Sequence, residues 1–538
     1  MSTAVTSVVE SDVKSAREVR EDLLAGCEIA LLDVREEALH AQGHPLFAAN
    51  LPVSRLELEA YARIPRRAAP IVVFDDGEGL AVKAAALLQS IGYEDVRLLH
   101  GGLEGWRNAG FELFRDVNAP SKAFGELVES RRNTPFVSAQ ELKALIDAKA
   151  DIVVVDVRRF DEFHTMSIPT ATSVPGAELA LRIRELTPSP NTRVIVNCAG
   201  RTRSIVGAQS LINLGLPNPV AALRNGTIGW TLASQHLDYG QTRTGPKATR
   251  ENQSLAARSA LRIADAAGVD RTLLGPVELW SHQADATVYC FDVRSPEEFE
   301  RGHLAGFRNA PGGQLVQETD MFAPVRNARI VLADDDGVRA NMTASWLAQM
   351  NWKVAVVDGL TPDDFRINGP WRNPLPPSPL PPGTEVSAAE VRQWQSGTGE
   401  RIAVLDLSPH RQYARRHIPG SVFIQRAHLE QALEVVRDAR KIVLVSTDGI
   451  ASRFAWQDAA AAFQVPVFLL QGGVDAWVAE GLRADATLPQ YACQPTDRYQ
   501  RPYEGKDVDA GTMQAYLDWE YGLVEQLERD GTHGFFVL

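Results

Sequence analysis

The segment that organises this 538-residue chain reads Val194-Ile195-Val196-Asn197-Cys198-Ala199-Gly200-Arg201-Thr202-Arg203. It opens with three β-branched residues, which favour a buried strand. Directly after it, apolar side chains recur at helical spacing from Ile205 to Ile212. The pattern therefore predicts a strand that ends near Asn197, a short loop that begins at Cys198, and a helix that starts near Arg203.

The predicted loop contains the groups that activate a cysteine. Backbone N–H groups at a helix start point toward the loop, and the helix dipole adds partial positive charge there. Arg201 and Arg203 add two full charges, and all of these effects favour a thiolate and an anionic ligand. Cys198 is therefore the candidate nucleophile, and the candidate substrate-binding residues are Ala199, Gly200, Arg201, Thr202 and Arg203. The plainer alternative is a buried structural cysteine, which the arginines and the glycine disfavour.

On either side of this loop, the chain repeats one pattern four times. Apolar runs that end in aspartate are Ile29–Asp33, Ile152–Asp156, Val288–Asp292 and Ile402–Asp406. Eleven residues after these aspartates come His44, Ser167, His303 and His417. A second apolar run ends before Asp75, Cys198, Asp334 or Ser446, which lie 42, 42, 42 and 40 residues after the first aspartate. Such constant spacing indicates four copies of one domain. The serine in the copy with the cysteine argues against a catalytic histidine.

The repeats predict an α/β fold, in which each domain has a mainly parallel sheet flanked by helices. The predicted domains are 10–117, 133–240, 270–372 and 384–485, called units 1 to 4 below. Polar linkers are expected at 118–133 and 240–252, with a helix at 255–267, and a stiff proline-rich spacer at 373–382.

A C-terminal helical tail is expected over 486–538. Met513, Tyr516, Trp519, Leu523 and Leu527 suggest an amphipathic helix there. Its apolar face is expected to dock on one of the domains or on a second subunit, which leaves a homodimer open.

Bulk composition narrows the class of protein. A net charge of −13 argues against nucleic acid or an anionic membrane as the main partner. The chain has four cysteines and no CxxC pair, so neither a disulfide framework nor a metal site is expected. Its first residues are polar, and no apolar run is long enough to span a membrane. The expected location is the cytoplasm.

Three cysteines lie outside the loop. Cys290 belongs to an apolar run and is expected to be buried and inert. Cys27 precedes a predicted strand and has no basic neighbours, whereas Cys493 lies among polar residues and is expected to be exposed. Sulfur acceptance by Cys493 is a remote alternative to an ordinary thiol.

These motifs resemble the rhodanese family of sulfurtransferases. The resemblance rests on the Asp-Val-Arg strand ends, the Gly43-His44 step, the Cys198 loop and the closing glycine turn with Trp230. It implies four rhodanese-like domains, in which Cys198 carries sulfur as a persulfide without metal or cofactor. It also implies tandem pairs, so unit 1 is expected to pack on unit 2 and wall the cleft above Cys198. Units 3 and 4 then form a second, inactive pair of less importance to the chemistry.

The expected donor is thiosulfate or a similar small anion, because the family's mercaptopyruvate branch lacks this pair of arginines. The expected acceptor is cyanide, a thiol or a protein. A cysteine phosphatase is the rival activity, but its loop has five residues between cysteine and arginine, whereas four separate Cys198 from Arg203. The alternative of another class is a sulfur-relay or scaffold protein, whose units with Asp75, Asp334 and Ser446 bind partner proteins.

Overall fold

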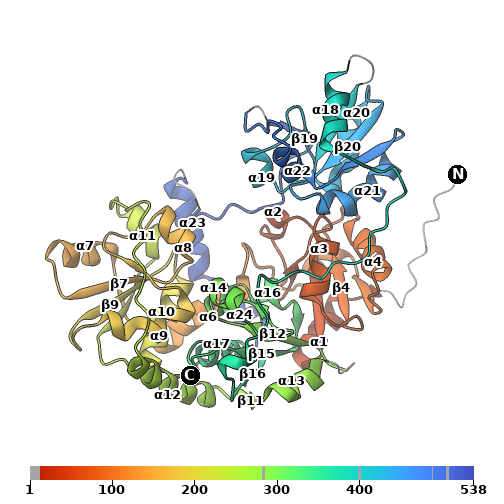
Figure 1. Ribbon diagram of the computed structural model, residues 1–538. Coiled ribbons are helices and arrows are strands. Elements are labelled where there is room, and N and C mark those ends of the chain that lie inside the picture. Colours follow the sequence, from red (N-terminus) through yellow and green to blue (C-terminus); the bar gives the residue numbers. More distant parts are fainter. Residues whose placement is uncertain (1–12, 282–284, 398–400, 488, 505–507) are drawn as a thin grey trace.

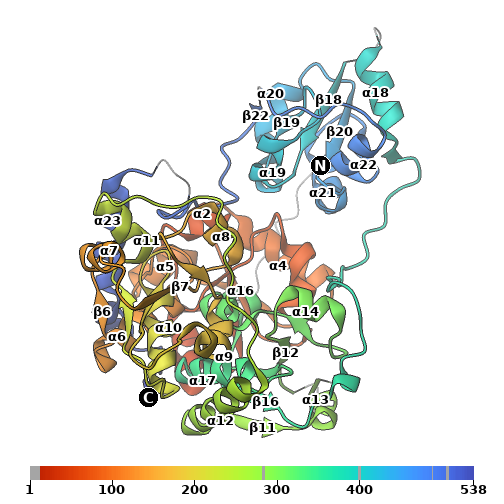
Figure 2. The same cartoon turned by 60° about the vertical axis from the view of Figure 1, so that its left-hand side comes forward.

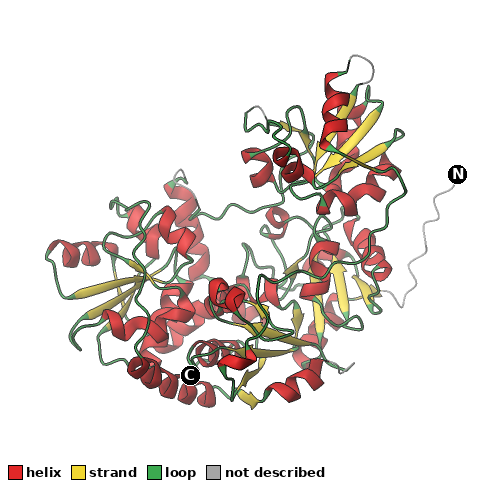
Figure 3. Cartoon of the chain, viewed as in Figure 1, coloured by secondary structure: helices red, strands yellow, loops and turns green. Residues whose placement is uncertain are grey.

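The computed structural model describes residues 13–281, 285–397, 401–487, 489–504 and 508–538. Within these ranges the chain forms four α/β units and a helical tail, which confirms the predicted fold class (Figure 1, Figure 3). The strands within each unit pair in parallel. In the described part of the chain, no helix is both long and apolar enough to cross a bilayer.

Unit 2 carries the cysteine loop on the central strand of its sheet, whose order is β6-β10-β9-β7-β8. Its strands are β6 (Phe136–Val137), β7 (Ile152–Asp156), β8 (Thr172–Ser173), β9 (Arg193–Asn197) and β10 (Val220–Leu223). Its helices are α7 (Ala139–Asp147), α8 (Phe160–Thr165), α9 (Gly176–Leu186), α10 (Thr202–Asn213) and α11 (Gly226–Leu232). Most of β9 is buried, because helices cover both faces of the sheet.

Unit 1 has the sheet order β1-β5-β4-β2, with β3 beside β2. Its strands are β1 (Val13–Lys14), β2 (Ile29–Asp33), β3 (Ala49–Asn50), β4 (Ile71–Phe74) and β5 (Val96–Leu99). Its helices are α1 (Ala16–Ala25), α2 (Glu37–His40), α3 (Leu56–Arg63), α4 (Leu80–Ser90) and α5 (Gly102–Asn108). The residues expected to form a polar linker to unit 2 are instead helix α6 (Ala119–Arg132), whose first ten residues are all buried.

Unit 3 follows α12 (Arg250–Ala266), which confirms the helix predicted after the second linker. Its sheet order is β11-β16-β15-β12-β13. The strands are β11 (Asp270–Thr272), β12 (Val288–Asp292), β13 (Arg308–Asn309), β15 (Arg329–Ala333) and β16 (Lys353–Val357). The helices are α13 (Leu274–Ser281), α14 (Pro296–Arg301), α15 (Gly312–Gln317), α16 (Thr319–Phe322), α17 (Arg339–Gln349) and the 3₁₀ turn Pro362–Asp364.

Unit 4 has the order β17-β21-β20-β18-β19-β22 and stands apart from units 2 and 3 (Figure 1, Figure 2). Its strands are β17 (Glu385–Val386), β18 (Ile402–Asp406), β19 (Val422–Phe423), β20 (Lys441–Val445), β21 (Val467–Leu470) and β22 (Gln490–Tyr491). Strand β22 pairs with β19 but belongs to residues expected to form the helical tail, so the sheet extends beyond the predicted end of unit 4. Its helices are α18 (Ala388–Ser396), α19 (His410–Arg415), α20 (Leu433–Val436), α21 (Ile450–Ala462), α22 (Gly473–Ala479) and the 3₁₀ segment Arg426–Ala432. A buried ion pair between Arg426 and Glu57, at 2.6 and 2.9 Å, joins it to unit 1.

The units do not associate as the tandem pairs that the resemblance implied. A short strand of unit 3, β14 (Val325–Arg326), adds to the sheet of unit 1 by antiparallel pairing with β2. Units 1 and 3 thereby share one apolar core with α6 and the tail. Unit 2 packs on unit 3 instead, where the Trp346 indole N–H donates to Ser210 Oγ at 2.9 Å.

The tail crosses three units. Residues after β22 contact unit 1, where the Ala38 N–H donates to the Thr496 carbonyl at 3.0 Å. Helices α23 (Ala510–Tyr521) and α24 (Leu523–Asp530) then lie against α11 and α6. Met513, Tyr516, Leu523 and Leu527 are buried and Trp519 is half-buried, so the predicted apolar face lies on this chain's own domains. It is formed by two helices that meet at Gly522, rather than by the one helix that was predicted.

Candidate functional site

The cysteine loop forms where it was predicted. Strand β9 ends at Asn197 and α10 begins at Thr202, so Cys198 stands at the carboxyl end of a parallel strand. That edge is where ligands bind in open α/β sheets. Because the first N–H groups of a helix have no partner within the helix, the amides at the start of α10 are suited to hold an anion.

The thiol of Cys198 is enclosed, with 1% of the residue exposed. Burial raises the pKa of the thiol, and the nearby Glu520 carboxyl acts in the same direction. The Arg203 charge and hydrogen bonds from Ser204 act against this rise. The loop was expected to lower the pKa of the thiol, but the effect of burial outweighs the Arg203 charge and the Ser204 hydrogen bonds.

The same loop position accepts a hydrogen bond in the other units. The amide six residues downstream donates to this side chain, as in Ala81 to Asp75 at 2.9 Å, Ala340 to Asp334 at 2.8 Å and Ser452 to Ser446 at 3.2 Å. Ser204 occupies the equivalent position relative to Cys198. In unit 1 the Asp75 carboxylate also accepts from the Gly77 N–H at 3.1 Å. The loop architecture is therefore a cradle of N–H donors, and unit 2 has sulfur at the position where units 1 and 3 have a carboxylate.

Arg201 is bound to carboxylates of α6. Its Nε and Nη2 donate to the two oxygens of Glu126 at 2.7 Å each, and Glu129 also accepts from Nη2. The guanidinium lies 4.0 Å from the centre of the Tyr521 ring in the tail. The side chain expected to hold the donor thus fastens the loop to α6 and α23 instead.

Arg203 is also in an ion pair. Its Nη1 and Nη2 donate to Glu162 of α8 at 2.8 and 3.0 Å. Although burial alone would raise it, this guanidinium lowers the pKa of Glu162 to about 2. Arg203 keeps its positive charge beside Cys198, but that charge is largely balanced by a partner that sequence reasoning did not identify.

A closing turn supports the loop from below. Gly226 has a φ of +52°, and a Cβ there would lie 2.4 Å from the Cys198 carbonyl oxygen. The next two amides donate to the loop, Thr227 to the Cys198 carbonyl at 2.9 Å and Ile228 to the Ala199 carbonyl at 3.0 Å. Only glycine permits this approach, which explains the glycine turn that ends the repeat.

A cavity of about 20 Å³, enough for roughly one water molecule, lies over the loop. Besides the loop residues, its walls are Lys122 of α6, Gln317 of α15, and Tyr503, Tyr516 and Glu520 of the tail. Among the described residues, unit 1 contributes nothing to this wall, so the expectation that it covers Cys198 is wrong. Of these wall residues, only Tyr516 was singled out from the sequence, as part of an apolar face. Glu520 could have been found in the same way, because it is an acidic residue one helical turn after Tyr516 on that apolar face.

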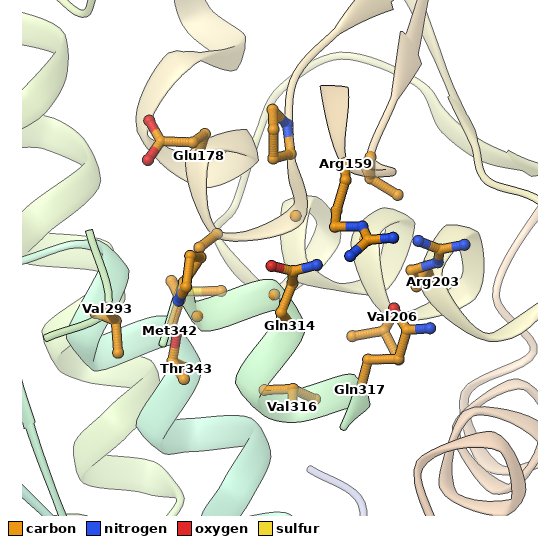
Figure 4. Close-up of a pocket in the computed structure, with 18 of the residues that line it drawn as sticks. Arg159, Glu178, Arg203, Val206, Val293, Gln314, Val316, Gln317, Met342 and Thr343 are labelled. Carbon is orange, nitrogen blue, oxygen red and sulfur yellow. The ribbon is translucent and has the colours of Figure 1, made fainter. Parts of the chain in front are cut away.

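A larger cavity of about 330 Å³ lies between units 2 and 3 (Figure 4). Arg159 and Arg203 line it from unit 2, and Gln314 and Gln317 line it from unit 3. Its remaining walls are mainly apolar and include Val206, Val293 and Met342. Thr202, Arg203 and Gln317 border both cavities, so this space adjoins the cysteine loop.

The other cysteines lie in unreactive surroundings or away from the loop. Burial raises the pKa of Cys290, in strand β12, to about 12. Cys493 is buried rather than exposed, because the segment after β22 packs on unit 4 and the Gln425 N–H donates to its Sγ at 3.3 Å. Cys27 is exposed, as a surface residue after α1.

The fold and the cradle define a class of α/β domain that presents a cysteine to an anion. The family model of the rhodanese-like domain matches residues 15–109, 138–233, 275–359 and 387–480. The chain therefore belongs to the rhodanese-like domain family.

Three known proteins bear on the activity. A crystal structure of thiosulfate sulfurtransferase from Pseudomonas aeruginosa is 57% identical, covers 98% of this chain and 99% of its own, and superposes with a TM-score of 0.96. A thiosulfate sulfurtransferase of the same species is 29% identical over an alignment of 221 residues, and the match covers 34% of this chain and 80% of that protein. A thiosulfate sulfurtransferase from Azotobacter vinelandii is 26% identical over the same shares of the two chains.

Proposed function

We propose that this chain is a thiosulfate sulfurtransferase in which Cys198 carries the transferred sulfur. The observation that carries the proposal is the near full-length similarity to the Pseudomonas aeruginosa thiosulfate sulfurtransferase. The site supports it, because Cys198 is the one thiol among the four equivalent loop positions and lies in a cradle of N–H donors.

The reaction has two half-reactions. The Cys198 thiolate attacks the outer sulfur of thiosulfate, forming a new S–S bond while the S–S bond of thiosulfate breaks. The bonding electron pair leaves with sulfite, and Cys198 becomes a persulfide. A nucleophilic acceptor then attacks the outer sulfur of this persulfide, and the electron pair returns to Cys198 as the thiolate.

The cradle supplies the electrostatic part of the reaction. The amides from Ala199 to Arg203 hold the donor's oxygens and stabilise the departing sulfite and the persulfide anion. Arg201 and Arg203 serve mainly through the loop geometry and the residual field, since Glu126 and Glu162 already occupy their guanidinium groups. A dianionic donor at the loop is stabilised by nearby positive charge. Arg203 is the cation that acts on Cys198, so we expect it to stabilise the donor.

The acceptor is proposed to be cyanide or a small thiol. The small cavity and the 1% exposure of Cys198 favour a compact acceptor over a folded protein. A free thiol at Cys198 requires a reducing compartment, which supports the cytoplasm as the location. A protein acceptor and a homodimer are further proposals.

Steady-state turnover of thiosulfate with cyanide tests the proposal. Cys198→Ser should abolish thiocyanate formation, whereas Cys290→Ser, at a half-buried thiol of unit 3, should keep wild-type turnover. Retention of most of the activity in Cys198→Ser would overturn the proposed role of this cysteine.

A relay or scaffold role predicts a different result from the same samples. The enclosed thiol argues against it, but units 1, 3 and 4 lack a loop thiol and remain surfaces for partner proteins. A carrier should turn over slowly with cyanide and transfer its sulfur quickly to a bound protein. Fast cyanide turnover without a partner supports the enzyme.

A further inference from the structure

The tail contributes one buried carboxyl group to the cavity over the cysteine loop. Glu520 of α23 is 1% exposed, and the Tyr516 hydroxyl donates to its Oε1 at 2.7 Å. Among the residues that the structure describes, Glu520 Oε2 has no hydrogen-bond partner, although it is buried. A buried polar atom without a partner carries a desolvation cost, so this oxygen indicates a ligand that the site receives.

The unpartnered oxygen faces the loop. A Cβ placed on Gly200 would lie 3.3 Å from Glu520 Oε2 and 3.3 Å from Tyr516 Cε1. Glu520, Tyr516, Gly200 and Cys198 all line the same small cavity. The carboxyl therefore points at the space above the loop, where the oxygens of an anionic donor would lie during attack by Cys198.

The charged groups around this space are already paired. Lys122 of α6 donates to Asp116 at 2.6 Å, and Arg201 of the loop is bound to Glu126 of α6. An ionised Glu520 would add a negative charge beside the Cys198 thiolate and the incoming dianion. A neutral Glu520 adds a hydrogen-bond donor instead, and carboxylic acids kept neutral by burial serve this purpose in other enzymes.

The surroundings favour the neutral form. Burial raises the pKa of Glu520 to about 8, with the Lys122 charge opposing the rise and the Glu126 carboxyl adding to it. The Tyr516 hydroxyl and the Arg201 guanidinium act in the direction of Lys122. At pH 7 the carboxyl is therefore mainly protonated, and the Tyr516 bond to Oε1 leaves Oε2 to carry the proton.

We propose that neutral Glu520 donates a hydrogen bond from Oε2 to an oxygen of the anionic sulfur donor. This inference rests on the proposed sulfur transfer. Tyr516 orients the carboxyl, and the loop amides hold the donor's other oxygens. The C-terminal tail is then part of the donor site of unit 2, although about 320 residues separate Glu520 from Cys198 in the sequence. The donor is recognised as a small oxyanion through neutral N–H and O–H groups rather than through free cations.

The test is the KM for thiosulfate between pH 6 and 9, with cyanide as the acceptor. Glu520→Ala should raise this KM about tenfold or more at pH 7, because a hydrogen bond to a charged ligand is lost. Glu520→Gln retains an N–H donor and should keep a near wild-type KM at pH 7. In the wild type the KM should rise above pH 8 as Glu520 ionises, and in Glu520→Gln this rise should be absent.

Asp518→Asn is the matched control, since it makes the same carboxyl-to-amide change on an exposed position of the same helix. It should keep the wild-type KM and pH profile. An unchanged KM in Glu520→Ala would overturn the inference, as would an alkaline rise in Glu520→Gln equal to that of the wild type. If Glu520→Ala fails to fold, the pH profile of Glu520→Gln decides alone.

Mass spectrometry separates this inference from the proposed function. Wild type, Glu520→Gln and Asp518→Asn are each treated with saturating thiosulfate, and their intact masses are recorded. A wild-type protein that gains no sulfur contradicts the proposed function itself. Sulfur gain in all three proteins, with no difference in the pH dependence of KM, contradicts only the role of Glu520.

Discussion

Units 2 and 3 pack against each other with equivalent loops that differ in their charges. Each loop has an arginine five residues after its key position, Arg203 after Cys198 and Arg339 after Asp334. Arg203 pairs with Glu162, and Arg339 pairs with the equivalent Glu298.

Arg339 has three further carboxylate partners. They are Glu178 of unit 2 at 2.7 Å, Asp335 at 3.0 Å, and Asp336. Unit 3 uses its arginine to join two units, and its loop aspartates exclude an anion. Unit 2 has Ala199 and Gly200 at the positions of Asp335 and Asp336, which leaves its cradle open to one. The comparison shows that the same loop can join units or bind an anion, depending on whether acidic residues such as Asp335 and Asp336 follow the key position.

The strongest way to break the comparison is to give unit 2 the key residue of unit 3. Cys198→Asp should lose all sulfur transfer, because a carboxylate cannot form a persulfide. The fold should survive at a cost of no more than about 1–2 kcal/mol, since equivalent amides already hold Asp75 and Asp334. Turnover and thermal denaturation on one sample measure both effects, and detectable thiocyanate production would contradict the account.

The next largest effect is expected at the interface arginine. Arg339→Ala should lower the free energy of unfolding by about 3–5 kcal/mol, because it leaves several carboxylates unpaired around a buried position. Urea denaturation measures the change. Arg401→Ala, which removes a pair exposed by 67% and 68%, is the control and should cost less than about 1 kcal/mol. Equal losses in both variants would show that Arg339 has no special structural role.

Arg203→Ala should act on chemistry more than on stability. It leaves the Glu162 carboxylate close to the loop and removes the charge that opposes the rise in the Cys198 pKa. The pH profile of the thiol alkylation rate should therefore shift to higher pH. The kcat/KM for thiosulfate should fall roughly 10- to 100-fold. Arg203→Lys, which keeps the charge, should recover much of the alkylation profile. An alkylation profile that does not move in Arg203→Ala would remove the electrostatic role.

The tail, unlike the two loops, should make the stability of the fold depend on pH through Glu520. Because the pKa of Glu520 is about 8 in the folded chain and near 4.5 when unfolded, the folded state binds the proton more tightly. Stability is therefore lost as the pH rises from about 4.5 toward 8. Glu520→Gln removes this loss, so its Tm should equal the wild-type Tm near pH 4.5 and exceed it near pH 8.5. Parallel pH dependence of the two Tm values would contradict the raised pKa.

The smallest effect is expected from placing a thiol in unit 3. Asp334→Cys should gain no reactivity toward thiosulfate, because Asp335 and Asp336 keep the loop acidic. Tested in the Cys198→Ser background, this variant should take up no sulfur. Sulfur uptake there would show that the backbone cradle alone is sufficient, and that the acidic residues are not what separates units 2 and 3.

The local elements could be predicted from the sequence, because they follow from periodicity and spacing. The end of β9 at Asn197, the start of α10 at Thr202 and the fourfold repeat all come from patterns within short windows. Helix α6 was misread as a linker, because its polar residues are buried only by contacts with other units. Lys122 and Glu126, for example, find their partners in Asp116 and Arg201.

The wall of the site depends on docking, which sequence patterns do not encode. The tail's apolar residues predict a buried face, but not that this face meets Gly200 of unit 2. Similarly, β14 is too short to be recognised as the strand that joins unit 3 to unit 1. The sequence places both arginines in the loop, but their carboxylate partners lie 41 and 75 residues away in the sequence and could not be recognised from it.

The mass of the intact protein after thiosulfate treatment tests the central claim most directly. The wild type should gain the mass of one sulfur atom, lose it on addition of cyanide, and gain nothing when Cys198 is replaced by serine. A wild-type protein that gains no sulfur, or a Cys198→Ser protein that gains it as the wild type does, would contradict the assignment of sulfur transfer to the unit 2 loop.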